Sequence, residues 1–196
     1  MSVRDLSPPE GYDPKSQFVV GQFMAGFTDQ LSNLKEITDG LSVAQLEWQP
    51  RPGVNTIGML LAHIAVAECW WLGVLPHGIS PEPEVEKRFV DALGIGMDDD
   101  GLPLAADGVH PNTLRGKTLG DYHDLLDRAR AAAHLTVRAW TDGELSLEHE
   151  TLRQPVTRRW ILYYVMQHTA AHLGQILLLK HLAATAGILL AQDTRA

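Results

Sequence analysis

The sequence predicts an all-α protein, a four-helix bundle with a long crossover between the second and third helices. Four stretches repeat apolar residues at three- and four-residue steps, which is the period of a helix. Little of the chain alternates as a strand would. Residues 76–117 are rich in Pro, Gly and Asp and form an unusually long connection. Such a connection is needed if the second and third helices run parallel, because the chain must travel back along the bundle.

The first helix is expected from Ser16 to about Thr38, where Asp39 and Gly40 provide a stop signal. Its apolar face consists of Val20, Phe23, Phe27, Leu31, Leu34 and Ile37. Residues 1–15 are polar and Pro-rich, so we expect them to form a flexible or draped arm. Residues 16–196 are then a single domain, consistent with a chain of 196 residues.

The second helix is expected from its N-cap Thr56 to about Leu75, just before Pro76. A single helical turn capped by Ser42 precedes it. The apolar face of the second helix consists of Ile57, Leu60, Ile64, Ala67 and Trp71. His63 falls on this same face, so the second helix is expected to direct a histidine inward.

The crossover is expected to hold at most a short helix near Glu82–Leu93. The acidic run at residues 98–100 lacks the alternating ligand spacing of a calcium loop, and we interpret it as solvated surface. The third helix is predicted over Thr118–Trp140, with Asp121 completing a capping box. A brief extended piece is expected at Leu145–Leu152.

The fourth helix, Thr157 to about Ala184, contains two histidines one turn apart, His168 and His172. Its inward face is predicted to comprise Ile161, Tyr164, Val165, His168, His172, Gln175, Ile176 and Leu179. An i,i+4 histidine pair is a two-point chelate for a divalent ion. No Glu follows His168, so the HExxH protease pattern is absent. His63 is the candidate third ligand; the alternative is three core histidines satisfied by ordinary hydrogen bonds.

Composition favours a soluble cytoplasmic protein. The formal net charge is −8 and no Lys- or Arg-rich run occurs, so no direct contact with nucleic acid is expected. Cys69 is the only cysteine, which excludes an internal disulfide and suits a reducing compartment. The N-terminus lacks the apolar core of a signal peptide. Lys180 and His181 interrupt the apolar tract of the fourth helix, so no membrane span is expected.

Two motifs and the placement of the crossover resemble one known family. The motifs are "LSVAQLEWQPRPGVNTIGMLLAHIAVAECWWL" and "HTAAHLGQ". In them the chain resembles the DinB-like four-helix metalloproteins, a family that includes metal-dependent S-transferases acting on bacillithiol or mycothiol. The likeness extends from about Gln17 to Ala184.

The resemblance implies a metal site formed by His63, His168 and His172, with an open coordination position. It further implies a divalent ion, usually zinc or nickel, a small-molecule substrate and a homodimer. Relatives often carry Arg where this chain has Leu173, so an anion-binding role for that arginine is not expected here.

Three functions remain open from the sequence. The preferred one is a transferase that activates a low-molecular-weight thiol at the metal site. The second is a hydrolase that uses metal-bound water, and the third is a non-catalytic metal-binding stress protein. Thiol-dependent loss of an electrophile, cleavage without thiol, or metal binding with neither activity would distinguish them.

Several other residues receive an interpretation. Gln175 either fixes a ligand ring or is simply polar, and Glu68 suits an ion pair within the bundle or at a dimer face. Cys69 is expected to pack. Arg158 and Arg159 lie where the helix dipole disfavours positive charge. They are expected either to pair with an acidic residue of the preceding loop, Glu148 or Glu150, or to capture an anionic thiol. The remaining aromatic and histidine side chains of interest are assigned to the surface, to packing or to a dimer interface: Trp70, Trp71, Trp160, His77, His110, His123, His134, His149 and His181.

Overall fold

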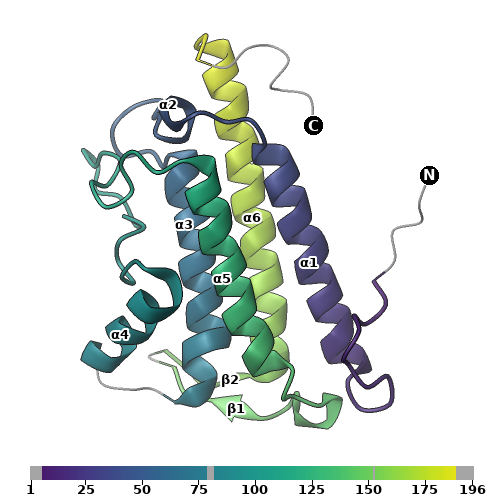
Figure 1. Ribbon diagram of the computed structural model, residues 1–196. Helices are drawn as coiled ribbons and strands as arrows, with labels where there is room; N and C mark the ends of the chain where they lie inside the picture. The colour runs from purple at the N-terminus through teal and green to yellow at the C-terminus, as the bar shows by residue number, and fades with distance from the viewer. Residues whose placement is uncertain (1–5, 79–81, 152, 189–196) are drawn as a thin grey trace, which may run out of the picture.

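The computed structural model describes residues 6–78, 82–151 and 153–188. Four long helical segments lie side by side and form a bundle (Figure 1). Three of the segments are single helices, α1 (Phe18–Thr38), α5 (Leu119–Val137) and α6 (Arg158–Thr185). The other begins with α3 (Ile57–Glu68). α3 and α5 run in one direction, and α1 and α6 run in the other (Figure 1). The predicted all-α bundle with a parallel second and third helix is therefore confirmed.

Side-chain caps define where these helices begin. The hydroxyl of Thr56 accepts a hydrogen bond from the backbone N–H of Met59, at 3.0 Å, at the start of α3. Thr118 and Asp121 form the predicted capping box of α5. Ser42 caps the single turn α2 (Val43–Leu46). Each cap satisfies an N–H group that the first helical turn leaves without an intrahelical partner.

The second helix of the bundle differs from the prediction in its last turns. After α3 the chain continues as a π-helix, η1 (Cys69–Val74), and a 3-10 turn, η2 (Leu75–His77). The N–H of Leu75 bonds to the carbonyl of Trp70, five residues earlier, and Pro76 has no N–H with which to extend an α-helix. The stretch Ile57–His77 is long and apolar enough to cross a membrane by length and composition alone. However, 72% of its most apolar window is buried inside the bundle.

The crossover contains α4 (Glu82–Leu93), which matches the predicted short helix and packs against α3, α5 and η1. The extended piece predicted before the last helix is a small antiparallel hairpin of β1 (Glu148–His149) and β2 (Val156–Thr157). Its expected end at residue 152 lies outside the described residues. The hairpin crosses the end of the bundle where α6 begins (Figure 1).

The core consists of two hydrophobic clusters, one centred on α3, α5 and the crossover, the other between α1, α5 and the start of α6. The described part of the N-terminal arm contributes to the second cluster through Tyr12, which is 7% exposed and meets His134 edge to face. Residues 1–5 and 189–196 of the predicted arm and domain lie outside the described residues. The two clusters leave the middle of α3 facing the middle of α6, which is where the histidines lie.

Candidate metal centre

Three histidines from two helices converge. Nε2 of His63 lies 3.1 Å from Nε2 of His168, and Nε2 of His172 lies 3.1 Å from the same atom. One ligand nitrogen from each ring falls within 4.8 Å of the others. The structure thus brings together all three residues that the sequence predicted as a metal site. They come from α3 and α6, which are not consecutive in the chain.

The three rings are half-buried and lie at the edge of the core. On the predicted inward face of α6, the aliphatic side chains are buried, as expected, whereas His168 and His172 are intermediate and Gln175 is exposed. The side chain of His63 is 25% exposed. An edge position leaves the ring nitrogens accessible from one side, which a binding site needs and a core position would not allow.

Hydrogen bonds at the far side of two rings determine which nitrogen carries the proton. Nδ1 of His63 donates to a carboxylate oxygen of Asp100 at 2.7 Å, and Nδ1 of His172 donates to Oε1 of Gln175 at 2.8 Å. A carboxylate only accepts, so the proton of neutral His63 lies on Nδ1. Nε2 of His63 and Nε2 of His172 then carry no proton, and the lone pair of each faces Nε2 of His168.

Burial keeps the rings of α6 uncharged. Loss of solvent, and after it the neighbouring His172 and His63 rings, together lower the pKa of His168 to about 3. Desolvation also lowers the pKa of His172, although its hydrogen bond to Gln175 opposes the shift. Neutral imidazole is the form that binds a metal ion.

The donor set fits a divalent cation. Three Nε2 atoms meet with at most one proton among them, so lone pairs oppose one another unless a positive charge lies between. Imidazole nitrogens bound to zinc at 2.0–2.1 Å in tetrahedral geometry are about 3.3 Å apart, close to the two separations of 3.1 Å from Nε2 of His168. Three histidines leave one tetrahedral position open, as in catalytic rather than structural zinc sites.

The interpretation of the acidic run as solvated surface is wrong for Asp100. Its side chain is 2% exposed, and its second oxygen accepts the backbone N–H of Leu102 at 2.9 Å. Asp98 does face solvent, as predicted. In the sequence, Asp100 stands out only as an acidic residue next to Gly101 in the crossover. Nothing local indicates that the crossover folds back onto α3 and buries this side chain.

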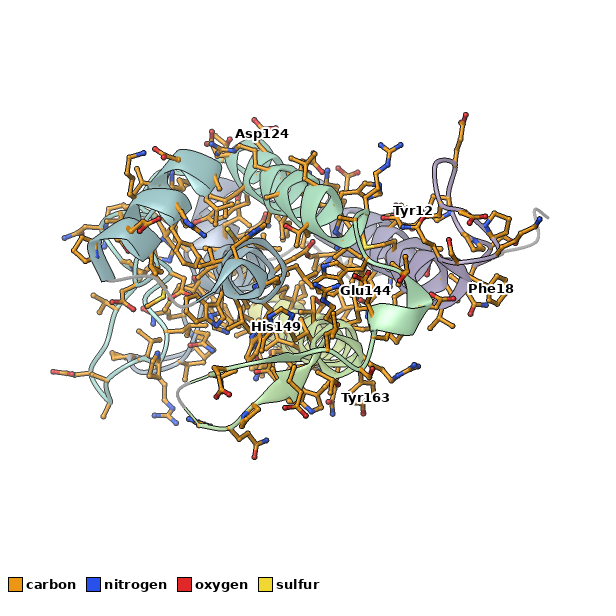
Figure 2. The ribbon with its side chains drawn as sticks, turned by 90° about the horizontal axis from the view of Figure 1, so that it is seen from below. Tyr12, Phe18, Asp124, Glu144, His149 and Tyr163 are labelled. Carbon is orange, nitrogen blue, oxygen red and sulfur yellow. The ribbon has the colours of Figure 1, made fainter. Side chains whose placement is uncertain are left out.

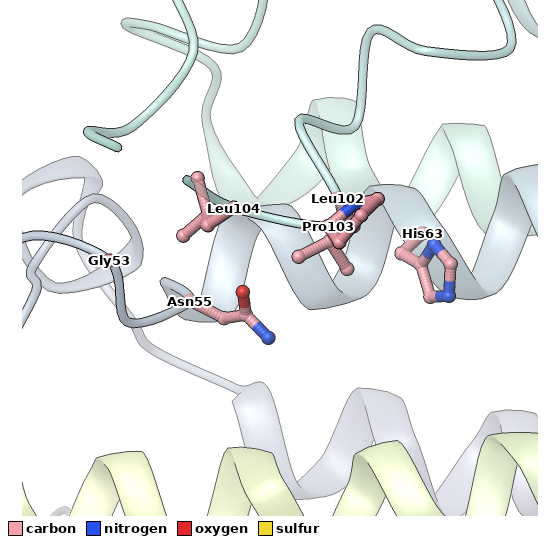
Figure 3. A pocket seen from close by; sticks show the side chains of 6 residues that line it. All are labelled: Gly53, Asn55, His63, Leu102, Pro103 and Leu104. Carbon is pink, nitrogen blue, oxygen red and sulfur yellow. The ribbon is translucent and has the colours of Figure 1, made fainter. Parts of the chain in front are cut away.

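A cavity of about 370 Å³ opens beside the histidines. His63 lies at one end of it and Asn55 towards the other, and Leu102, Pro103 and Leu104 of the crossover form one side (Figure 3). Gly53 completes the lining. The long crossover therefore supplies both the carboxylate behind His63 and an apolar wall beside it.

Comparison with known proteins assigns the family. The model of the mycothiol S-transferase family matches residues 22–184, a span that includes all three histidines. The chain belongs to the mycothiol S-transferase family. No curated protein matches the sequence.

Two solved structures share the fold of this mycothiol S-transferase family member. One is a DinB-like protein from Bacillus cereus ATCC 10987, with 18% identity and a TM-score of 0.57 over 85% of this chain and 91% of that one. The other is a conserved protein from Enterococcus faecalis, with 16% identity and a TM-score of 0.59 over 85% of this chain and 98% of that one. The predicted DinB-like architecture is confirmed.

Glu68 and Cys69 do not join the site. Glu68 is buried and forms a two-point ion pair with Arg130 of α5, with N···O distances of 2.5 and 3.0 Å. This is the ion pair within the bundle that the sequence predicted as one of two options. Cys69 is 2% exposed and burial raises the pKa of its thiol to about 11, so it is a packing residue, as predicted.

Arg158 has a structural role at the start of α6. Its guanidinium lies 3.5 Å from a carboxylate oxygen of Glu144 and 4.7 Å from the centre of the Trp140 ring. The predicted partners, Glu148 and Glu150, are therefore wrong for Arg158. The loop turns back after α5, so Glu144, which precedes Glu148 and Glu150 in the chain, faces the start of α6. Arg159 is exposed.

An aromatic group adjoins the histidines on the side of the hairpin. Tyr164 lies one turn before His168, with ring centres 5.7 Å apart, and stacks on Trp160 at 4.8 Å. Trp71 contacts both Tyr164 and Trp160, at 4.9 and 5.4 Å. Tyr163 points to the outside of α6 and is 54% exposed (Figure 2).

The six other histidines stay apart from the site, as predicted. His110 is the most buried of them and bonds through Nδ1 to the hydroxyl of Thr56, at 2.9 Å. His149 stacks on Trp140 at the hairpin. His123 contacts the hydroxyl of Thr38 at 3.2 Å. His181 is exposed on α6.

Proposed function

We propose that this protein is a metal-dependent transferase that joins a low-molecular-weight thiol, mycothiol by its family, to an electrophilic small molecule. The observation that carries the proposal is the convergence of three Nε2 atoms beside a cavity that His63 lines, with two of the opposite ring nitrogens held by oxygen acceptors. The family match supports the thiol.

The chain's own residues prepare the site. A divalent ion, zinc or nickel, would be held by His63, His168 and His172 and would supply Lewis acidity that lowers the pKa of a thiol at its open position. Asp100 and Gln175 orient two of the rings. In the overall transfer, the thiol gives its proton to solvent, its sulfur forms a bond to carbon, and the leaving group departs with the electron pair of the broken bond.

The first test measures divalent metal per chain on protein purified without a histidine tag. The parent is expected to hold about one ion, and a His168→Ala, His172→Ala double variant to hold little, because two of three ligands are lost. His181→Ala is a matched control on the same helix, since this exposed histidine is outside the site. A folded parent that takes up neither zinc nor nickel would contradict the proposal.

The second test measures loss of an electrophile such as monochlorobimane with and without mycothiol. Loss that requires both thiol and bound metal, and that the double variant lacks, supports the transferase. Metal-dependent ester or amide cleavage without thiol would replace it with a hydrolase. Stoichiometric metal with neither activity would indicate a non-catalytic metal-binding protein.

A further inference from the structure

The cavity beside His63 is built from two segments that hydrogen bonds hold together. The N–H of Gly53 donates to the carbonyl of Gly108 at 2.8 Å, and the N–H of His110 donates to Oε1 of Gln49 at 3.2 Å. The hydroxyl of Thr56 bonds to His110 at 2.9 Å. These contacts tie the loop before α3 to the crossover, so the cavity is preformed, which lowers the entropic cost of binding a ligand.

Asn55 is the polar group at the far end of this cavity. Its side-chain amide points into the open space, towards the end where His63 lies (Figure 3). Within residues 6–78, 82–151 and 153–188, this amide has no hydrogen-bond partner. It is half-buried, and an amide offers two donors and an acceptor. A half-buried amide with free donors in a cavity is suited to bind hydroxyl or amide groups of a ligand.

The lining of the cavity favours an uncharged ligand. In the part of the chain that the structure describes, the lining residues are Gly53, Asn55, His63, Leu102, Pro103 and Leu104, none of which is Lys, Arg, Asp or Glu. A carboxylate or phosphate placed against this lining near Asn55, away from the ion proposed at the histidines, would lose solvent without gaining a cation, and that loss is costly. Sugar hydroxyls and amides lose less and can bond to Asn55.

The spacing sets a minimum length for the ligand. Thr56 caps α3, and His63 lies seven positions after it in the chain. At a rise of 1.5 Å per residue, the backbone of Thr56 lies about 10 Å from that of His63 along the helix axis. A ligand that reaches both the histidines and Asn55 must therefore be longer than cysteine or 2-mercaptoethanol.

We propose that Asn55 is a substrate-binding residue that holds the uncharged, hydroxyl- or amide-bearing end of the thiol co-substrate, about two turns of α3 before His63. The site thereby selects long uncharged thiols over short thiols and over thiols that carry carboxylates. The proposal rests on the proposed function for its ligand class, but it concerns binding and is tested by binding.

The experiment measures calorimetric affinity for S-methylmycothiol, whose capped sulfur removes the contribution of a thiolate to binding. The parent and Asn55→Ala are compared, both with the metal that the purified parent holds. The variant is expected to bind about three- to tenfold more weakly, the value of one or two net hydrogen bonds. Asn112→Ala is the matched control, because this exposed asparagine lies in the crossover outside the cavity lining.

Two further ligands test selectivity. S-methylglutathione, which carries two carboxylates, is expected to bind the parent at least about tenfold more weakly than S-methylmycothiol. S-methylcysteine is expected to bind the parent and Asn55→Ala equally. Equal affinity of parent and Asn55→Ala for S-methylmycothiol, no binding of that ligand by the parent, or a preference for S-methylglutathione would overturn the proposal. Binding as expected without thiol-dependent turnover would leave it standing and reject the transferase alone.

Discussion

At the scale of single residues, the two acceptors behind the histidines are not equivalent. Asp100 is buried and presents a charged oxygen to His63, whereas Gln175 is exposed and presents a neutral amide oxygen to His172. Hydrogen bonds to charged groups are stronger than neutral ones, and burial removes the competition from water. Asp100 should therefore contribute more than Gln175 to the orientation and basicity of its ring.

Asp100→Ala is expected to weaken metal affinity by about 10- to 100-fold, because the ring of His63 loses the group that fixes its tautomer. Gln175→Ala should have a smaller effect. Competition with a chromophoric chelator measures both affinities, and circular dichroism checks folding. Asp98→Ala, an exposed member of the same acidic run, is the control and should match the parent. An Asp100→Ala protein that folds and binds metal as tightly as the parent would refute the role given to Asp100.

At the scale of elements, the crossover works as a wall of the site as well as a connection. It carries α4 against the bundle and then returns along α3, where it contributes Asp100 and the apolar side of the cavity (Figures 1 and 3). It meets the loop before α3 at Gly53, whose N–H donates to the carbonyl of Gly108 at 2.8 Å. Gly53 has a φ of +79°, and a Cβ there would lie 2.5 Å from the carbonyl oxygen of Ala106. Only glycine allows the two segments to meet this closely.

Gly53→Ala should therefore move the cavity wall and leave the histidines in place. We expect weaker binding of S-methylmycothiol, or a higher KM for mycothiol, with unchanged metal content. The free energy of unfolding should fall by about 1–2 kcal/mol because of the left-handed backbone at Gly53, and further because of the collision of the new Cβ with Ala106. Denaturant unfolding measures this change. Gly40→Ala is the control, because Gly40 also has a positive φ, +75°, but open space around it. Equal behaviour of the two variants would show that the close approach at Gly53 has no functional consequence.

At the scale of the whole molecule, burial lowers the pKa of several histidines. Desolvation is the largest cause of the lowered pKa of His110, and it also lowers the pKa of His123, His134 and His149. In the unfolded chain each of these has a pKa of about 6.5. Because the folded value is the lower one, acid favours the unfolded chain, and the stabilising contribution is complete only above pH 6.5.

The metal-free protein should therefore lose stability as the pH falls from about 7.5 through 6.5 to 5.5. Urea unfolding at these three pH values measures the free energy of unfolding. A His110→Gln variant should show a shallower decline over the same range, because its side chain takes up no proton on unfolding. A parent whose stability stays level or rises between pH 7.5 and 5.5 would contradict this prediction.

Local patterns were sufficient to predict most of the fold and the three histidines. Apolar periodicity, the caps at Thr56 and Thr118 and the stop at residues 39–40 all act within a few residues, so they are legible in the sequence. His63 was identified because it shares the apolar face of its own helix. The family resemblance added the expectation that it joins His168 and His172, which the geometry now shows.

What the sequence determined by itself was therefore the set of helices, their order, the parallel pair and the helix faces that carry His63, His168 and His172. Only the tertiary structure decided that Asp100 is buried behind His63, that Arg158 pairs with Glu144, and that Asn55 lines a cavity with the crossover. The physical reason is that the crossover lacks a regular period. Which of its side chains meet the bundle depends on where an irregular chain returns along α3, and that path is set by contacts between residues far apart in the sequence.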